Sequence, residues 1–186
     1  MFKTKFILVI FLIFVLPIAS YGQEISGGKE TRKEYYPDGK LMSLCEYTKE
    51  GLLDGTCKTY DIEGTLFSEN TYKDNIQTGR KTLYQNGTLQ RMDTYRDGKM
   101  NGPSKQYYES GKLKSETTYK DGKLVGPAKG YHESGMLKSE LTYKDGKAIG
   151  PFKQYYENGK LKFETTYWDG QAIGAWKEYD ENGNLK

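Results

Sequence analysis

The chain has 186 residues, a formal net charge of +3 and a mean hydropathy of −0.82. Its 17 Tyr and 22 Gly accompany few Ile, Val and Leu, which excludes a thick core between two layers, while the aromatic content and regular pattern argue against disorder. Removal of Lys3 and Lys5 with the N-terminal segment lowers the charge to +1, so composition gives no electrostatic basis for binding nucleic acid.

The N-terminus, MFKTKFILVIFLIFVLPIASYGQ, combines two lysines with an apolar run from Phe6 to Pro17 and small residues near its end. This pattern predicts a secretory signal peptide over residues 1–22, cleaved after Gly22. A membrane anchor is the alternative, but the run is shorter than the roughly 20 apolar residues that a spanning helix needs. We therefore expect an exported protein that is periplasmic, on the outer surface or secreted, with no transmembrane segment after cleavage. A short linker is expected over residues 23–31.

Residues 32–186 repeat with a period near 24. The most regular feature is a turn glycine, at Gly39, Gly64, Gly87, Gly111, Gly135, Gly159 and Gly183. A leucine follows each glycine by two places, at Leu41, Leu66, Leu89, Leu113, Leu137, Leu161 and Leu185. Four places before the glycine stand Tyr35, Tyr60, Leu83, Tyr107, Tyr131, Tyr155 and Tyr179, and eight places after it stand Tyr47, Tyr72, Tyr95, Tyr119, Tyr143 and Tyr167. The chain therefore contains six full units and a seventh half-unit.

Each unit holds two runs of about six to eight residues rich in Tyr, Thr and Phe, separated by turns that contain glycine. Helices are excluded because glycine recurs about every dozen residues, and each interior glycine costs a helix about 1 kcal/mol. The expected fold is all-β: an elongated single-layer antiparallel sheet of stacked β-hairpin repeats of about 24 residues each.

The turn at the repeated glycine is predicted from the residues that precede it. A two-residue type I′ hairpin needs positive φ there, and this position also holds Ser110, Ser134 and Glu63, which disfavour that conformation. Pro37 suits the second position of a type I turn. We therefore expect a three-residue loop that ends with Gly39 in a G1 bulge.

The predicted register assigns side chains to two faces. Tyr155 lies opposite Leu161, and alternation places Tyr167 on the same face and Lys162 and Glu164 on the other. The Lys and Glu ladder is interpreted as a solvated face, whereas the aromatic ladder is either a thin core or a contact surface. The candidate partner-binding residues are Tyr107, Tyr119, Tyr131, Tyr143, Tyr155, Tyr167, Trp168 and Trp176.

Cys45 and Cys57 flank a turn, and the signal peptide would deliver them to an oxidising compartment. The corresponding positions of a later unit hold Leu141 and Phe152, an apolar pair that suggests neighbours across two strands. A disulfide is therefore predicted, with two free thiols in a thin core as the alternative.

The sequence offers little for catalysis, so we expect no enzyme, no cofactor and no metal. His132 is the sole histidine and stands where other units hold Tyr, so it is interpreted as a variant of that repeat position. Asp121, Asp145 and Asp169 occur in Asp-Gly turns, which Asp favours by bonding its own backbone. A calcium-binding row of such residues would need the denser Gly-Asp pattern of calcium-binding β-solenoids. A cell-wall hydrolase would need two carboxylates facing a cleft.

Units such as YYENGKLKFETTYWDGQAIG resemble the variant form of the MORN (membrane occupation and recognition nexus) repeat, found in bacterial proteins known as YwqK-type antitoxins. The resemblance covers roughly residues 32–186 through the recurring YxxxGxL and YxDG elements. It implies a sheet of stacked hairpins and a scaffold or protein-binding role, with no catalytic residues to carry over.

The expected function is that of an exported, non-enzymatic scaffold that binds a protein or an envelope component through its aromatic face or a sheet edge. Glycan binding is the nearest variant, because aromatic strips also stack on sugar rings. The alternative is an antitoxin or immunity protein that neutralises a partner toxin. The half-unit ending at Lys186 has no evident cap, so edge-to-edge self-association is a further expectation.

Overall fold

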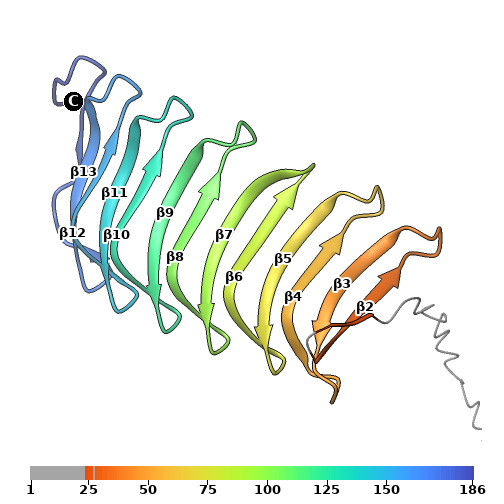
Figure 1. Cartoon of the computed structure of the whole chain (residues 1–186). Helices are drawn as coiled ribbons and strands as arrows, with labels where there is room; N and C mark the ends of the chain where they lie inside the picture. Colours follow the sequence, from red (N-terminus) through yellow and green to blue (C-terminus); the bar gives the residue numbers. More distant parts are fainter. Residues whose placement is uncertain (1–23, 27) are drawn as a thin grey trace, which may run out of the picture.

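The computed structural model describes residues 24–26 and 28–186, and the predicted signal peptide lies outside these residues. The described part of the chain forms fifteen strands and no helix (Figure 1). The strands are β1 (Glu24–Ser26), β2 (Lys29–Tyr35), β3 (Leu41–Tyr47), β4 (Leu53–Tyr60), β5 (Leu66–Lys73), β6 (Ile76–Gln85), β7 (Thr88–Arg96), β8 (Lys99–Tyr107), β9 (Leu113–Lys120), β10 (Lys123–Tyr131), β11 (Leu137–Lys144), β12 (Lys147–Tyr155), β13 (Leu161–Trp168), β14 (Gln171–Ala172) and β15 (Lys177–Glu178).

All fifteen strands belong to one antiparallel sheet in which each strand from β1 to β14 pairs with the next along the chain. β15 pairs with β13, on the same side as β14. Figure 1 shows a single layer of hairpins stacked along one direction, so the predicted fold class is confirmed. The sheet begins with β1 and β2, inside the segment 23–31 that was expected to be a linker, because β1 pairs with the start of β2.

The turns at the upper edge in Figure 1 have the predicted three-residue form. In the first, the amide of Gly39 donates to the carbonyl of Tyr36 at 2.9 Å, and the amide of Tyr36 donates to the carbonyl of Lys40 at 2.8 Å. Gly39 has a φ of 88°, a value that glycine adopts without steric cost. The same pair of bonds recurs at the turns of Gly64, Gly111, Gly135, Gly159 and Gly183.

The turn at Gly87 departs from this prediction. Asn86 and Gly87 have φ values of 49° and 76°, and Gln85 pairs with Thr88, which defines a two-residue type I′ turn. This loop is one residue shorter than the others, and Asn tolerates the left-handed conformation that Ser or Glu would not. The shortening places Tyr84, rather than the predicted Leu83, at the repeated tyrosine position.

The Asp-Gly turns at the opposite edge connect successive units. Asp121 and Gly122 have φ values of 49° and 83°, so they form a type I′ turn. The amide of Gly122 then donates to the carbonyl of Met100, in the preceding unit, at 2.8 Å. Equivalent bonds from Gly146 and Gly170 repeat this link toward the C-terminus. From Gly98 onward, the glycine of this turn therefore stabilises the stack as well as the turn.

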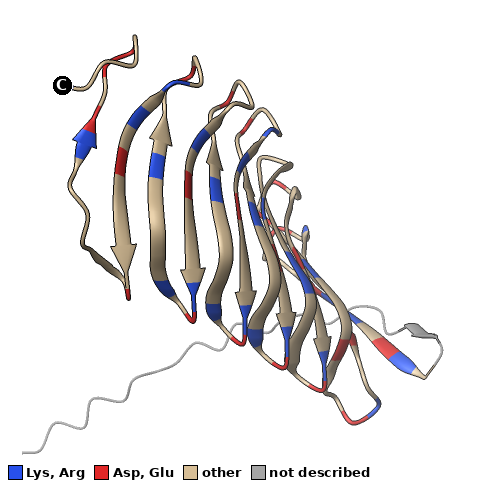
Figure 2. Ribbon diagram, turned by 90° about the vertical axis from the view of Figure 1, so that its left-hand side faces the viewer, with Lys and Arg blue, Asp and Glu red and all other residues tan. Residues whose placement is uncertain are grey.

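Each Gly-Pro segment interrupts the pairing and bends its strand. On β10 the register to β9 shifts between Val125 and Lys129, and Pro127 has no ladder partner on that side. Proline has no amide hydrogen to donate, so it fits a bulge better than a regular central strand. The strands are visibly bowed in both Figure 1 and Figure 2.

The interior of this thin sheet is made of small and polar side chains. The most deeply buried described residues include Asp93 and Thr165, each with 3% exposure. The buried apolar residues are only Cys45 and Ala148 in the described part of the chain, and no described side chain is fully buried. Asp93 accepts a 2.6 Å hydrogen bond from Ser104 Oγ and two bonds from Arg91 Nε, so its buried charge is compensated. Stability therefore depends on the hydrogen-bond ladder and on contacts between neighbouring units rather than on a hydrophobic core.

Candidate binding surfaces

One face of the sheet carries alternating lysine and glutamate, as predicted. From β8 onward the register places seven of these residues directly opposite one another in the order Lys105, Glu116, Lys129, Glu140, Lys153, Glu164 and Lys177. We call this row the Lys–Glu row and this side the Lys–Glu face (Figure 2). Because opposite charges alternate across the strands, the row stabilises the sheet and leaves little net charge to attract a charged ligand.

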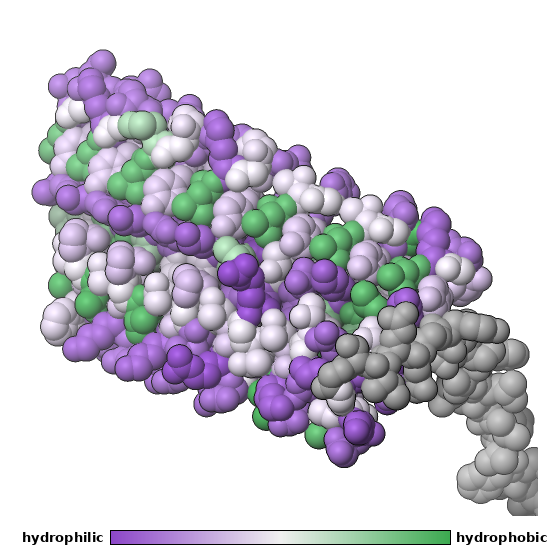
Figure 3. Space-filling view, viewed as in Figure 1, coloured by the Kyte–Doolittle hydropathy of each residue, from purple (hydrophilic) through white to green (hydrophobic). Residues whose placement is uncertain are grey.

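A row of tyrosine and leucine pairs runs beside the Lys–Glu row. Each tyrosine pairs across the turn with a leucine, and from Tyr107 onward each lies two residues beyond a lysine of that row. The pairs are Tyr35–Leu41, Tyr60–Leu66, Tyr84–Leu89, Tyr107–Leu113, Tyr131–Leu137, Tyr155–Leu161 and Tyr179–Leu185. Figure 3 shows apolar side chains in a line along the molecule next to hydrophilic ones. Apart from the exposed Leu185, this Tyr–Leu row is half-buried and offers an extended amphipathic strip.

Hydrogen bonds fix the direction of the tyrosines in this row. Tyr131 Oη donates to Glu116 at 2.7 Å and Tyr155 Oη donates to Glu140 at 2.7 Å, each reaching back to the preceding unit. The bond to Glu116, together with burial, raises the pKa of Tyr131 to about 12. Burial, together with the bond to Glu140, raises the pKa of Tyr155 to about 12. These phenols stay protonated and oriented, with their rings lying over the sheet.

These bonds correct the predicted assignment of faces. Tyr155 does lie opposite Leu161, as expected, but it stands on the same face as Glu140 rather than on the reverse. The cause is the bulge of the three-residue loop, where the register shifts between Gln154 and Tyr155. Lys162 is the extra residue on β13, because Gln154 pairs with Phe163 and Tyr155 pairs with Leu161. Counting alternate residues along β13 therefore does not give the face of Tyr155.

The second set of candidate tyrosines lies on the reverse face. Tyr167 contacts Phe152 edge-on, with ring centroids 6.2 Å apart, and Tyr119 and Tyr143 occupy the same repeat position. Phe152 also packs against Phe163, and Phe163 packs against Trp176 at 5.0 Å. The eight predicted residues therefore divide between two faces. Tyr107, Tyr131, Tyr155 and Trp168 lie on the Lys–Glu face by alternation, whereas Tyr119, Tyr143, Tyr167 and Trp176 lie on the reverse face.

The two tryptophans are far more exposed than the tyrosines. Trp168 retains 68% exposure and Trp176 retains 65%, whereas all six candidate tyrosines are half-buried. Trp168 borders a shallow hollow with Ile149 and with charged residues of two neighbouring Asp-Gly turns. The tyrosines therefore contribute mainly to packing, and the tryptophans offer the larger free aromatic surface.

A second aromatic ladder links units through the backbone. Tyr108 Oη donates to the carbonyl of Tyr131 at 2.6 Å, and Tyr156 Oη donates to the carbonyl of Tyr179 at 2.7 Å. His132 occupies the same position in the intervening unit, and its Nε2 lies 3.0 Å from the carbonyl of Tyr155. His132 therefore replaces a tyrosine of the repeat, as the sequence predicted.

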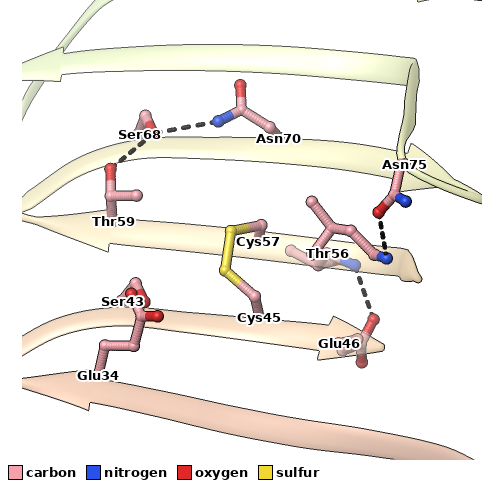
Figure 4. The surroundings of a disulfide bond; sticks show 11 residues. Glu34, Ser43, Cys45, Glu46, Thr56, Cys57, Thr59, Ser68, Asn70 and Asn75 are labelled. Carbon is pink, nitrogen blue, oxygen red and sulfur yellow. Dashed lines mark hydrogen bonds between the residues drawn. A yellow bond between two sulfur atoms is a disulfide. The ribbon is translucent and has the colours of Figure 1, made fainter. Parts of the chain in front are cut away.

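The predicted disulfide is present near the N-terminal end of the sheet. Cys45 on β3 and Cys57 on β4 are direct cross-strand partners and are bonded to each other (Figure 4). Polar side chains surround the bond: Ser43 Oγ donates to Glu34 at 2.9 Å, and Thr59 and Ser68 share a 2.7 Å hydrogen bond. The reverse face thus changes from small polar residues near the disulfide to aromatic residues near β13.

Two exposed apolar residues were not among the predicted contacts. Ile62 and Phe67 retain about half of their exposure and border a hollow with Tyr36 and Met42 that Ser43 and Thr59 of the reverse face also line. The sequence did contain a sign of them, since the last four units hold Glu at the position of Ile62 and Lys at the position of Phe67, and the unit of Gly87 holds Gln at both. We call Ile62 and Phe67 the N-terminal apolar patch.

Asp54 carries the strongest electrostatic perturbation among the described carboxyl groups. It lies 2.7 Å from Lys29 Nζ and also bonds Lys73 Nζ, and these two ammonium groups lower its pKa from 3.8 to about 2. Lys73 lies on the neighbouring strand β5 and Lys29 lies on β2, beyond β3, so the site joins three strands at the N-terminal end of the sheet. The described residues include no group of three or more His, Cys, Asp or Glu placed to hold a metal ion. Nor do they include a helix long and apolar enough to cross a membrane.

The repeated hairpin is also recognisable at the level of the protein family. The MORN repeat variant pattern matches residues 31–49, 53–74, 100–121, 124–145, 149–169 and 173–186, which together make up more than half of the chain. The chain belongs to the MORN repeat variant family. The matched segments of this MORN repeat protein coincide with successive hairpins, so the family assignment and the observed sheet agree.

Other comparisons add little about this MORN repeat protein. No curated protein matches it. Among solved structures it is similar to the crystal structure of TarM, with 11% identity and a TM-score of 0.28 over 65% of this chain and 19% of that chain. It is also similar to a variant of S. aureus TarM in complex with fondaparinux, alpha-GlcNAc-glycerol and UDP, with 11% identity and a TM-score of 0.27 over 64% of this chain and 19% of that one. This chain therefore spans about a fifth of the length of those proteins, and likenesses of this size carry no conclusion about function.

Proposed function

We propose that this MORN repeat protein is an exported, non-enzymatic scaffold that binds another protein or a component of the cell envelope. The observation that carries the proposal is the single-layer sheet, which leaves both faces uncovered along the described residues. Large apolar side chains stand exposed on these faces, including Phe67, Trp168 and Trp176. Aromatic residues with free surface are enriched in binding interfaces because they combine a large apolar body with few rotatable bonds.

Export is supported by the predicted signal peptide and by the disulfide. A bond between Cys45 and Cys57 persists in an oxidising compartment and is rare where thiols are kept reduced. The absence of a catalytic role is part of the proposal and rests on the residue types of the described part of the chain. Its sole histidine bonds a backbone carbonyl of the next unit.

For a protein partner, the N-terminal apolar patch is the favoured contact. Ile62 and Phe67 stand at positions that hold charged residues or glutamine in every later unit, so the fold itself does not require apolar side chains there. Exposed apolar surface that the fold does not need is typical of an interaction site.

The repeat supplies variants that test this proposal while preserving the fold. The double variant Ile62→Glu and Phe67→Lys introduces residues that later units already hold at these positions. We expect the purified protein to recover a specific partner from the envelope fraction of the producing cells, and the double variant to lose it. The matched control, Glu133→Gln with Lys138→Gln, changes the same two positions of a central unit and should retain the partner. A pulldown that recovers nothing beyond a control with a scrambled sequence would refute the proposal.

The alternative, an antitoxin or immunity protein, is distinguished by repeating the pulldown with the cytoplasmic fraction. A neutralised toxin would be recovered as a stoichiometric cytoplasmic complex, and its activity would be inhibited by the purified protein. Self-association edge to edge would instead appear as a second copy of the chain in a size measurement, at the sheet edge formed by β14 and β15.

A further inference from the structure

The strongest departure from the repeat on the Lys–Glu face is Trp168. The residue after the equivalent tyrosine is Lys73, Arg96, Lys120 and Lys144 in the four preceding units, and all four are exposed. The last unit has Trp168 at this position, with 68% of its surface exposed. The hairpin forms equally well with a solvated cation there, so packing does not explain the indole. An exposed indole also costs solubility, which a binding role would offset.

The surroundings of Trp168 form a hollow between two adjacent units. Lys144, Asp145, Lys147 and Ile149 come from the turn between β11 and β12 and from the start of β12, and Trp168 and Asp169 come from the next turn. Lys147 Nζ and Asp169 Oδ1 form a 2.6 Å ion pair at the rim, and both side chains remain more than half exposed. The hollow thus combines the indole of Trp168 and the aliphatic side chain of Ile149 with the ammonium groups of two lysines and the carboxylates of two aspartates.

This combination selects among ligand classes. Two lysines and two aspartates have no net charge, so the hollow has no electrostatic preference for a phosphate-bearing ligand such as a nucleic acid. The same balance of charge gives the hollow no electrostatic preference for a ligand cation, although a cation can stack on an indole. A neutral ligand with hydroxyl groups needs no such preference, because hydroxyls donate to carboxylates and accept from ammonium groups.

A pyranose ring has in addition the shape that the indole requires. Its axial C–H bonds form a weakly positive apolar face, which is attracted to the negative face of an aromatic ring. The hydroxyls around the ring edge point outward, where the charged groups of the two turns lie. We propose that the hollow at Trp168 binds a neutral carbohydrate, with the indole as the stacking platform and Asp145, Lys147 and Asp169 as hydrogen-bonding groups.

This inference rests on the proposed function, because it names the chemical class of one envelope component that the scaffold binds. The binding site is distinct from the N-terminal apolar patch, which lies in the hairpins of β3 to β5. A single shallow platform that buries one sugar ring has little contact area, so we expect weak binding, with a dissociation constant of about 1 mM for a short oligosaccharide.

The two tryptophans allow a direct measurement. Trp176→Phe introduces the residue that the preceding unit holds at the same position, Phe152, and leaves Trp168 as the only indole. Titration of this variant with N-acetylchitotetraose, cellotetraose and maltotetraose is expected to give a saturable change in tryptophan fluorescence with at least one of them. Glycerol, which has hydroxyls but no ring, is expected to give no saturable change.

The decisive variant is Trp168→Lys, which restores the residue of the preceding unit and should leave the thermal melt unchanged. Isothermal titration calorimetry on the intact, oxidised protein is expected to show at least a tenfold loss of affinity for this variant relative to the wild-type protein. No saturable binding of any of the three oligosaccharides, or equal binding by Trp168→Lys, would overturn the inference. If the partner pulldown still succeeds in that case, the scaffold function stands without the carbohydrate site, so the two proposals fail separately.

Discussion

Replacing Leu137 by Ala, in the middle of the array, is expected to lower the free energy of unfolding more than replacing Leu41 by Ala near its N-terminal end. Both leucines are half-buried, and they lie opposite the equivalent tyrosines Tyr131 and Tyr35. Full burial of a leucine side chain is worth about 1.5–3 kcal/mol, so half-burial corresponds to roughly 1–1.5 kcal/mol at each site. The open layer allows water to fill the space, so a large additional cavity cost is not expected.

The two positions differ in the consequence of the lost contact. The unit that contains Leu41 is at the end of the stack, and it can open while the remaining hairpins stay paired, which limits the loss measured for the whole chain. Leu137 begins β11, and hairpins on both sides of it depend on the junction between β10 and β11. We therefore expect Leu137→Ala to cost about 1 kcal/mol more than Leu41→Ala.

Thermal unfolding followed by circular dichroism, with the disulfide kept oxidised in both variants, measures this difference. Hydrogen exchange of the native protein adds the position of the loss, which should be confined to the first hairpins for Leu41→Ala. Equal losses in the two variants would mean that the sheet unfolds as one cooperative unit. The description of the protein as a chain of nearest-neighbour contacts would then be wrong.

Three further predictions concern single contacts. Replacing Cys45 by Thr and Cys57 by Ala introduces residues that another unit holds at the equivalent positions. The double variant should lower the free energy of unfolding by at most about 3 kcal/mol, which is the loop-entropy limit for so short a loop. A larger loss in denaturant melts would show that the bond also stabilises the native fold directly. Because the pKa of Asp54 is lowered to about 2, its contribution to the free energy of unfolding is present above pH 3.8 and is lost as the pH falls toward 2. The variant Asp54→Asn should therefore lose less stability than the wild-type protein in thermal melts over this pH range. Because the pKa of Tyr155 is raised to about 12, the contribution of this residue to the free energy of unfolding is present below pH 10 and is lost as the pH rises toward 12. The variant Tyr155→Phe should therefore lose less stability than the wild-type protein in alkaline thermal melts. An equal loss of stability in the two proteins would contradict the role of the bond to Glu140.

Local chemistry explains why so much of the fold was predictable from the sequence. The recurring glycines define turns whose conformation other residues adopt only with strain, and the β-branched and aromatic runs between them have room for one strand each. Pro37 identified the type I turn, and the cysteine pair and His132 were placed by comparing units with one another. Each of these inferences needs residues that are neighbours along the chain or equivalent between repeats, and such relations are visible in the sequence itself.

The faces of the sheet were decided only by the tertiary structure. A single-residue bulge between Gln154 and Tyr155 moves the tyrosine to the side of the glutamates, and the deletion before Gly87 exchanges Leu83 for Tyr84. Because side chains alternate between the two faces, an error of one residue reverses the predicted face of every residue beyond it. The conformational preferences of single residues do not reveal at which position the pairing accommodates the extra residue. The sequence by itself therefore determined the hairpin, its period and its stacking in one layer. The structure determined which side chains share a surface, because that depends on how each bulge is accommodated against the neighbouring strand.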